Sequence, residues 1–95
     1  MRTDFVESYD FFIKKLGICS QRLMCIEEMS ELTKELCKLE RYKGTEKEQD
    51  IINNIREEIA DVLNTVEELE HYYGYKEIEF IRENKINRAL NKLNK

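Results

Sequence analysis

Two short acidic motifs are the part of this 95-residue chain with the clearest potential for chemistry. Glu28 and Glu31 lie three positions apart, and Glu58 and Asp61 repeat that spacing further along the chain. Residues three apart on a helix are neighbours on one face, so each motif would present its two carboxylates together. Such groups repel one another unless a cation lies between them, and a set made only of oxygens suits Mg²⁺ or Mn²⁺ better than zinc.

The apolar residues predict the elements that carry these acids. Hydrophobic side chains recur every three or four positions, which is typical of amphipathic helices. The pattern predicts four helices, over about 4–16, 19–43, 46–73 and 77–93. We therefore expect an all-α fold in which residues 1–95 form a single domain, because a chain this short has room for one core.

Helix-ending and helix-starting residues separate these segments. The chain contains no proline, and its three glycines, Gly17, Gly44 and Gly74, fall where the apolar periodicity stops, as expected of helix C-caps. Thr45 and Glu48 have the spacing of a capping box and predict the start of the third helix. The connection between the second and third helices is therefore short, and two long helices joined in this way form an antiparallel hairpin.

The hairpin brings the two acidic motifs to the same level. Residues equally far from the turn face one another, so Glu28 lies opposite Asp61. Glu31 lies opposite Glu58 for the same reason. The alternative is that the acids are a solvated face of a chain in which 38% of residues are charged. The shared level of the two motifs supports a metal site, and the residues alone leave the solvated face open as the alternative.

Composition limits the partners. The net charge of −4 and a pI near 5.1 argue against a nucleic-acid polymer, which is bound through clustered Lys and Arg. A hydrophobic content of 41% is small for a chain of this length, so we expect a homo-oligomer, either a homodimer or a homotetramer. We expect no membrane partner and, by elimination, a cytoplasmic protein, because no apolar run is long enough to cross a bilayer. Cys19, Cys25 and Cys37 are expected to be reduced, packed thiols.

The acidic motifs resemble those of the MazG-like, all-alpha nucleoside triphosphate pyrophosphatase superfamily, which carries EExxE on one helix and ExxD on the next. The matching residues are Glu27-Glu28-Met29-Ser30-Glu31 and Glu58-Ile59-Ala60-Asp61, and the resemblance extends from Ile18 to about Leu90. It implies an enzyme that hydrolyses a nucleoside triphosphate, (d)NTP, to the monophosphate and pyrophosphate. It also implies that all four acids of the two motifs hold Mg²⁺, with Mn²⁺ as a substitute.

The resemblance further implies substrate-binding residues. Lys85 and Arg88 occupy the place of basic residues that follow ExxD in the family, where they would bind phosphate oxygens, and their alternative is a role as surface cations. Gln21 lies seven residues before Glu28 on the same helical face and is a candidate contact for sugar or base. The preferred base and sugar stay open, since this chain has no tryptophan and no recognisable specificity loop.

Two other functions compete with this interpretation. A di-iron helical bundle needs two Glu-x-x-His pairs, whereas His71 is the single histidine of the chain. A non-catalytic helical module for protein–protein interaction explains the apolar stripes equally well. It does not explain why acids repeat at facing levels of the hairpin.

Overall fold

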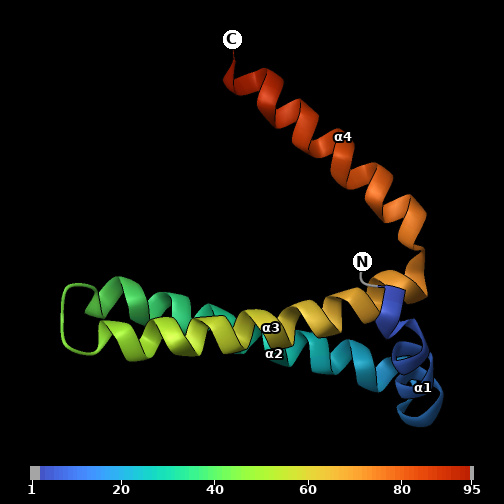
Figure 1. The fold of residues 1–95 in the computed structure, drawn as a ribbon, viewed down its shortest axis with the longest axis horizontal. Helices are drawn as coiled ribbons and strands as arrows, with labels where there is room; N and C mark the ends of the chain where they lie inside the picture. The colour runs from blue at the N-terminus through green and yellow to red at the C-terminus, as the bar shows by residue number, and fades with distance from the viewer. Residues whose placement is uncertain (1–2, 95) are drawn as a thin grey trace.

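The computed structural model describes residues 3–94 and contains four α-helices, which confirms the all-α prediction. A short 3₁₀ turn, η1 (Thr3–Phe5), leads into the helices, which are α1 (Val6–Leu16), α2 (Ile18–Tyr42), α3 (Glu48–Tyr73) and α4 (Tyr75–Leu93). Helices α2 and α3 form the predicted long antiparallel hairpin, α1 lies across its open end, and α4 leads away from it (Figure 1). No helix in this range is long and apolar enough to cross a membrane.

The hairpin turn differs in detail from the predicted capping box. Helix α3 begins at Glu48, two residues later than expected. The Thr45 hydroxyl accepts a hydrogen bond from the Lys47 backbone N–H at 3.3 Å, and the Glu48 carboxylate accepts one from the Gly44 N–H at 3.3 Å. Thr45 and Glu48 therefore stabilise the turn, and neither is the N-cap. Gly44 adopts a φ of +81°, which favours glycine, as a turn at this point requires.

Two polar contacts fasten α1 to the end of α3. The Tyr9 hydroxyl donates a hydrogen bond to Glu67 Oε2 at 2.6 Å, and the ring of Tyr9 is buried. The next residue of α1, Asp10, places its Oδ1 2.7 Å from Nε2 of His71, which lies one turn beyond Glu67 on α3. These contacts hold the aromatic face of α1 over the space between α2 and α3.

The apolar core of the described chain is small. Its buried hydrophobic residues are Tyr9, Cys25, Ile51 and Ile55. The stripes that predicted the hairpin are only partly covered, since Met29 on α2 and Ile59 on α3 remain 44% and 42% exposed. The cysteines are all free, as expected, but only Cys25 is buried. Cys19 and Cys37 are exposed, which corrects the expectation that all three are packed.

Helix α4 has no buried residue. It follows Gly74, whose φ is +116°, and runs away from the hairpin without contacting α2 (Figure 1). Of the apolar residues that predict this helix, Ile78 is half-buried, whereas Ile81, Ile86, Leu90 and Leu93 are exposed, as is Phe80. The sequence predicted that this helix exists, and the structure shows that this chain alone does not cover it.

Candidate metal centre and adjoining pocket

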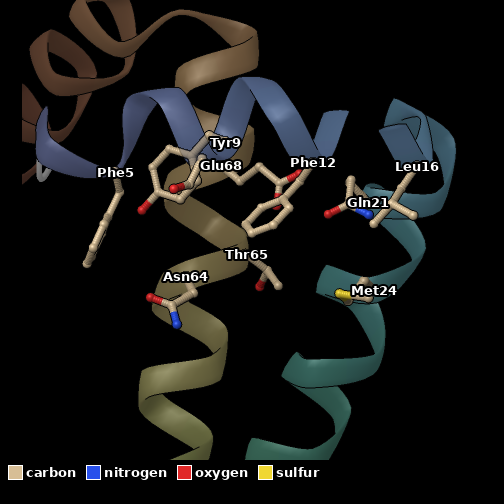
Figure 2. A pocket seen from close by; sticks show the side chains of 10 residues that line it. Phe5, Tyr9, Phe12, Leu16, Gln21, Met24, Asn64, Thr65 and Glu68 are labelled. Atoms are coloured by element: carbon tan, nitrogen blue, oxygen red, sulfur yellow. The ribbon is translucent and has the colours of Figure 1, made fainter. Parts of the chain in front are cut away.

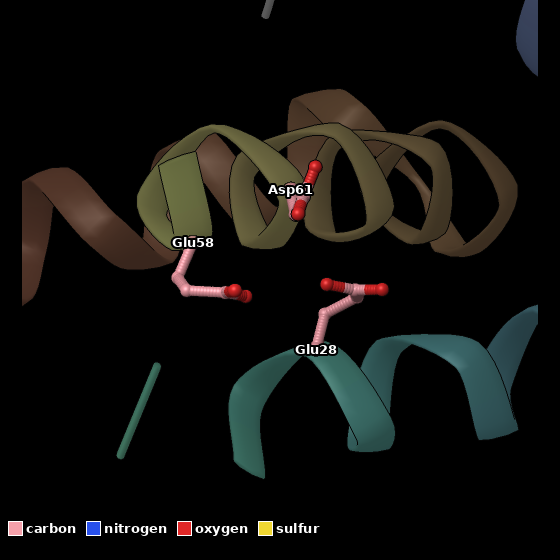
Figure 3. Close-up of side chains that lie close together, drawn as sticks. All are labelled: Glu28, Glu58 and Asp61. Atoms are coloured by element: carbon pink, nitrogen blue, oxygen red, sulfur yellow. The ribbon is translucent and has the colours of Figure 1, made fainter. Parts of the chain in front are cut away.

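Three of the four predicted acids meet between the two arms of the hairpin. Glu28 reaches across from α2, while Glu58 and Asp61 project from α3 (Figure 3). One carboxylate oxygen from each residue lies within 4.8 Å of the others. The facing positions predicted from the turn thus bring Glu28 and Asp61 together, and they do so because both helices continue without interruption from the turn to this level.

The carboxylates of this group disfavour one another's ionised form. Partial burial, followed by the charges of Asp61 and Glu58, raises the pKa of Glu28. Partial burial and then the charge of Asp61, followed by those of Glu31 and Glu35, raise the pKa of Glu58. Glu58 Oε2 is buried and has no hydrogen-bond partner among the described residues. An oxygen in that situation is suited to a cation.

Glu31 and Glu35 flank the three-residue group. Glu31 was predicted to lie opposite Glu58, and its charge does act on Glu58, but its carboxylate is exposed and lies outside the group. Glu35 was not predicted, although it is 9% exposed and its Oε2 has no hydrogen-bond partner in the described chain. Its position seven residues after Glu28 was the available signal, because residues seven apart point in nearly the same direction on a helix.

A cavity of about 440 Å³ adjoins the acidic group, on the side of the hairpin toward α1. Gln21 from α2 and Glu68 from α3 both line it, and they are 3% and 4% exposed (Figure 2). With its amide nitrogen turned toward Glu68, Gln21 donates hydrogen bonds of 2.7 and 3.0 Å to the two carboxylate oxygens. Burial raises the pKa of Glu68. The structure therefore places Gln21, a predicted substrate contact, in the wall of a cavity.

Aromatic and aliphatic side chains form the rest of this cavity. Phe5, Tyr9 and Phe12 line it from η1 and α1. In Figure 2 the ring of Phe12 projects toward the space between the two long helices, whereas Tyr9 lies over α3 and Phe5 lies on the side of α3 away from α2. Met24 on α2 and Thr65 on α3 lie below them, each one turn from the acidic group. An apolar pocket with a few polar groups is the usual form of a small-molecule site. Sequence patterns did not reveal it, because the aromatic residues of α1 also fit an ordinary core.

The structure does not bring Lys85 and Arg88 to the acidic group of their own chain. Both are exposed on α4, which has no contact with α2. Their predicted role in phosphate binding would therefore need another copy of the chain.

Comparisons of the chain with protein-family models, curated proteins and solved structures found no match. The function is accordingly inferred from the residues of the chain and from their geometry.

Proposed function

We propose that this protein is a Mg²⁺-dependent nucleoside triphosphate pyrophosphohydrolase, which converts a (d)NTP to the (d)NMP and pyrophosphate. The observation that carries the proposal is the meeting of Glu28, Glu58 and Asp61 from two helices, with carboxylate oxygens within 4.8 Å of one another. The EExxE and ExxD spacings of the MazG-like superfamily support the same assignment.

The donor set fits a hard divalent cation. It consists of carboxylates alone, which suits Mg²⁺ or Mn²⁺. Partial burial and then the charges of neighbouring carboxylates raise the pKa values of Glu28 and Glu58, and Glu58 Oε2 is buried without a hydrogen-bond partner among the described residues. A cation held by these groups would favour their ionised forms.

The chain's own contribution to the reaction is positioning. Two long helices fix the carboxylates before substrate arrives, and phosphoryl transfer depends mainly on positioning and charge neutralisation. Mg²⁺ bound there would neutralise phosphate charge and make an attacking water more acidic. Glu31 adds negative charge beside the group, and the unpartnered oxygen of Glu35 can accept a hydrogen bond from a water. A Ser, Cys or His nucleophile is not required.

The adjoining cavity gives the nucleoside a place to bind. Gln21 precedes Glu28 by two helical turns, and Glu68 follows Asp61 by two turns, so this pair lies about 10 Å along the hairpin from the acidic group. That separation matches the length of a nucleotide from its α-phosphate to the far edge of its base. We assign the triphosphate to the acidic end and the base to the cavity.

A homo-oligomer would complete this arrangement. The exposed apolar face of α4 and the partly covered stripes of the hairpin leave surfaces that a second copy can bury. Lys85 and Arg88 lie on the same projecting helix, so docking of α4 on a second copy would carry both cations to another hairpin. We propose that they bind phosphate oxygens there, in a homodimer or homotetramer.

The same exposed surfaces favour the second candidate function, a non-catalytic helical module for protein–protein interaction. That function uses the apolar stripes of α2, α3 and α4 and assigns no role to the acidic group. The two candidates differ in whether nucleotide is consumed.

Product analysis separates them. The full-length protein is incubated with each NTP and dNTP in Mg²⁺, and products are identified by chromatography, with a chelator-treated sample as the control. We expect monophosphate and pyrophosphate, lost on chelation. Diphosphate and phosphate would contradict the proposed reaction, and the absence of turnover with every nucleotide would favour the interaction module.

A further inference from the structure

A buried pair of polar side chains in the cavity wall, Gln21 and Glu68, offers hydrogen-bond acceptors, which limits the bases that the cavity can bind well. The inference rests on the proposed function, since it treats the cavity as the nucleoside site. Glu68 is 4% exposed, and no basic side chain of the described chain lies within ion-pairing distance of it. Its carboxylate accepts hydrogen bonds from the amide nitrogen of Gln21, at 2.7 and 3.0 Å. A carboxylate so deeply buried is stabilised by further donors.

The polar groups beside this pair either use their hydrogens elsewhere or are exposed. Because the Gln21 nitrogen is directed at Glu68, the remaining polar atom of that amide is its carbonyl oxygen. The Thr65 hydroxyl is directed at the backbone carbonyls of Val62 and Asp61, at 3.0 and 3.3 Å, which uses its hydrogen. The hydroxyl of Tyr9, which also lines the cavity, donates its hydrogen to Glu67. The other lining groups that can donate, Ser8 and Asn64, are exposed.

We infer that the Gln21–Glu68 pair selects a nucleobase that carries an exocyclic amino group, and that it discriminates against uracil and thymine. An amino group has two N–H donors and no strongly accepting lone pair, so it complements the carboxylate and amide oxygens. Cytosine, adenine and guanine each carry one. The selected class is therefore the amino-bearing nucleotides.

Uracil and thymine present the opposite pattern. Each has one N–H between two carbonyl oxygens, so at least one carbonyl would face the oxygens of Glu68 or Gln21. Sites built to bond a substrate N–H reject analogues that lack it, because buried polar groups are then left unpaired. We expect kcat/KM to favour the amino-bearing member of the dCTP and dUTP pair by about tenfold or more.

The aromatic wall provides affinity without this discrimination. Rings such as those of Phe5 and Phe12 can stack on any base, because every base has a π-face. The choice between amino and carbonyl groups is therefore assigned to Gln21 and Glu68.

Nucleoside binding tests the inference separately from catalysis. Saturation-transfer NMR is recorded on the full-length protein without Mg²⁺, with cytidine, adenosine, uridine and thymidine in turn. Signal from the amino-bearing nucleosides and little from the other two is the expected result. Equal signal from all four would overturn the selectivity, and no signal from any would overturn the nucleoside site. Either failure leaves the hydrolysis assay, and hence the proposed function, to be judged independently.

Glu68→Gln tests the residue itself. The variant keeps the size of the side chain but adds a donor, so the preference for dCTP over dUTP in kcat/KM should fall toward parity. Glu46→Gln, in the exposed turn at the other end of the hairpin, is the matched control and should keep the preference. An unchanged preference in folded Glu68→Gln would overturn the assignment. If this variant does not fold, the wild-type comparison of the four nucleosides still decides the question.

Discussion

The hairpin and α4 have similar sequence patterns but very different surroundings. Both carry apolar residues at helical spacing, yet α2 and α3 bury Cys25, Ile51 and Ile55 against each other, whereas α4 buries nothing. The hairpin also brings acids from distant positions together, while Lys85 and Arg88 on α4 stay exposed. Apolar periodicity therefore predicts that a helix forms, but it does not predict which part of the protein packs against its apolar face. For the hairpin, the short turn determines that α2 and α3 pack against each other. No sequence feature determines in the same way what packs against α4.

The largest expected effect is the loss of activity when one acid of the hairpin is neutralised. Glu58→Gln removes the charge with the most acidic neighbours in the group. We expect kcat to fall by about 10³-fold or more, since phosphoryl transfer depends strongly on stabilising the charge of the transition state. Glu28→Gln should lower kcat in the same way. Circular dichroism should show the helical content of wild type in both variants. Glu57→Gln, exposed on the same helix, should stay within about threefold of wild type.

Mixing two inactive variants tests whether Lys85 and Arg88 on α4 serve the hairpin of a second copy. One carries Glu58→Gln, and the other carries Lys85→Gln with Arg88→Gln. If the cations serve a second copy, a mixed dimer has one intact site. Random exchange in a two-fold symmetric dimer then restores about a quarter of wild-type activity. No recovery after subunit exchange, verified by native mass spectrometry, would show that the cations act within their own chain or not at all.

Core truncations should distinguish the two regions by their concentration dependence. Ile55 is 9% exposed within its own chain, so Ile55→Ala should lower the free energy of unfolding by about 2–4 kcal/mol at any protein concentration. Ile86 is 62% exposed, so Ile86→Ala should destabilise only where the oligomer forms. Urea denaturation at two protein concentrations measures both. A concentration-independent loss for Ile86→Ala would argue against burial of α4 by a second copy.

The smallest expected effect is on pH dependence. The pKa values of Glu28 and Glu58 are raised in the folded state. At a pH between their unfolded and folded pKa values, the folded protein therefore binds more protons than the unfolded chain. The contribution of these groups to stability therefore increases as the pH is lowered through their raised pKa values toward the ordinary pKa of glutamate. Thermal unfolding with chelator should show this gain in wild type and a smaller one in the Glu28→Gln/Glu58→Gln variant. Equal pH profiles would mean that the two carboxylates do not interact in solution.

The sequence predicted the acidic group because its geometry follows from local rules. Helix periodicity and the turn at Gly44 place Glu28 opposite Asp61, and the structure joins them with Glu58. Glu31 lies outside the group although it is as far from Glu28 along α2 as Asp61 is from Glu58 along α3, so the three-residue spacing does not by itself decide which acids meet. Glu35 points in nearly the same direction as Glu28, because seven residues complete almost two whole turns. The same rule would have found Glu35, had it been extended by one further turn.

The pocket and the course of α4 could not be predicted from sequence patterns. The pocket depends on how α1 crosses the hairpin, which is fixed by long-range contacts such as Tyr9 with Glu67 and Asp10 with His71. Gln21 stands out by its spacing from Glu28, but its partner Glu68 is indistinguishable in sequence from the solvated glutamates around it. The direction of α4 depends on the backbone conformation of Gly74, and a glycine can adopt many backbone conformations.

The most direct test of the central claim is whether the two arms of the hairpin bind one divalent cation together. Titration with Mn²⁺, followed by the electron paramagnetic resonance signal of the free ion, can be performed on wild type and on variants of each arm. We predict binding by wild type and Glu57→Gln, and loss of that binding in both Glu28→Gln on α2 and Asp61→Asn on α3. Binding that persists in either arm's variant, or no binding by wild type, would contradict the shared metal site.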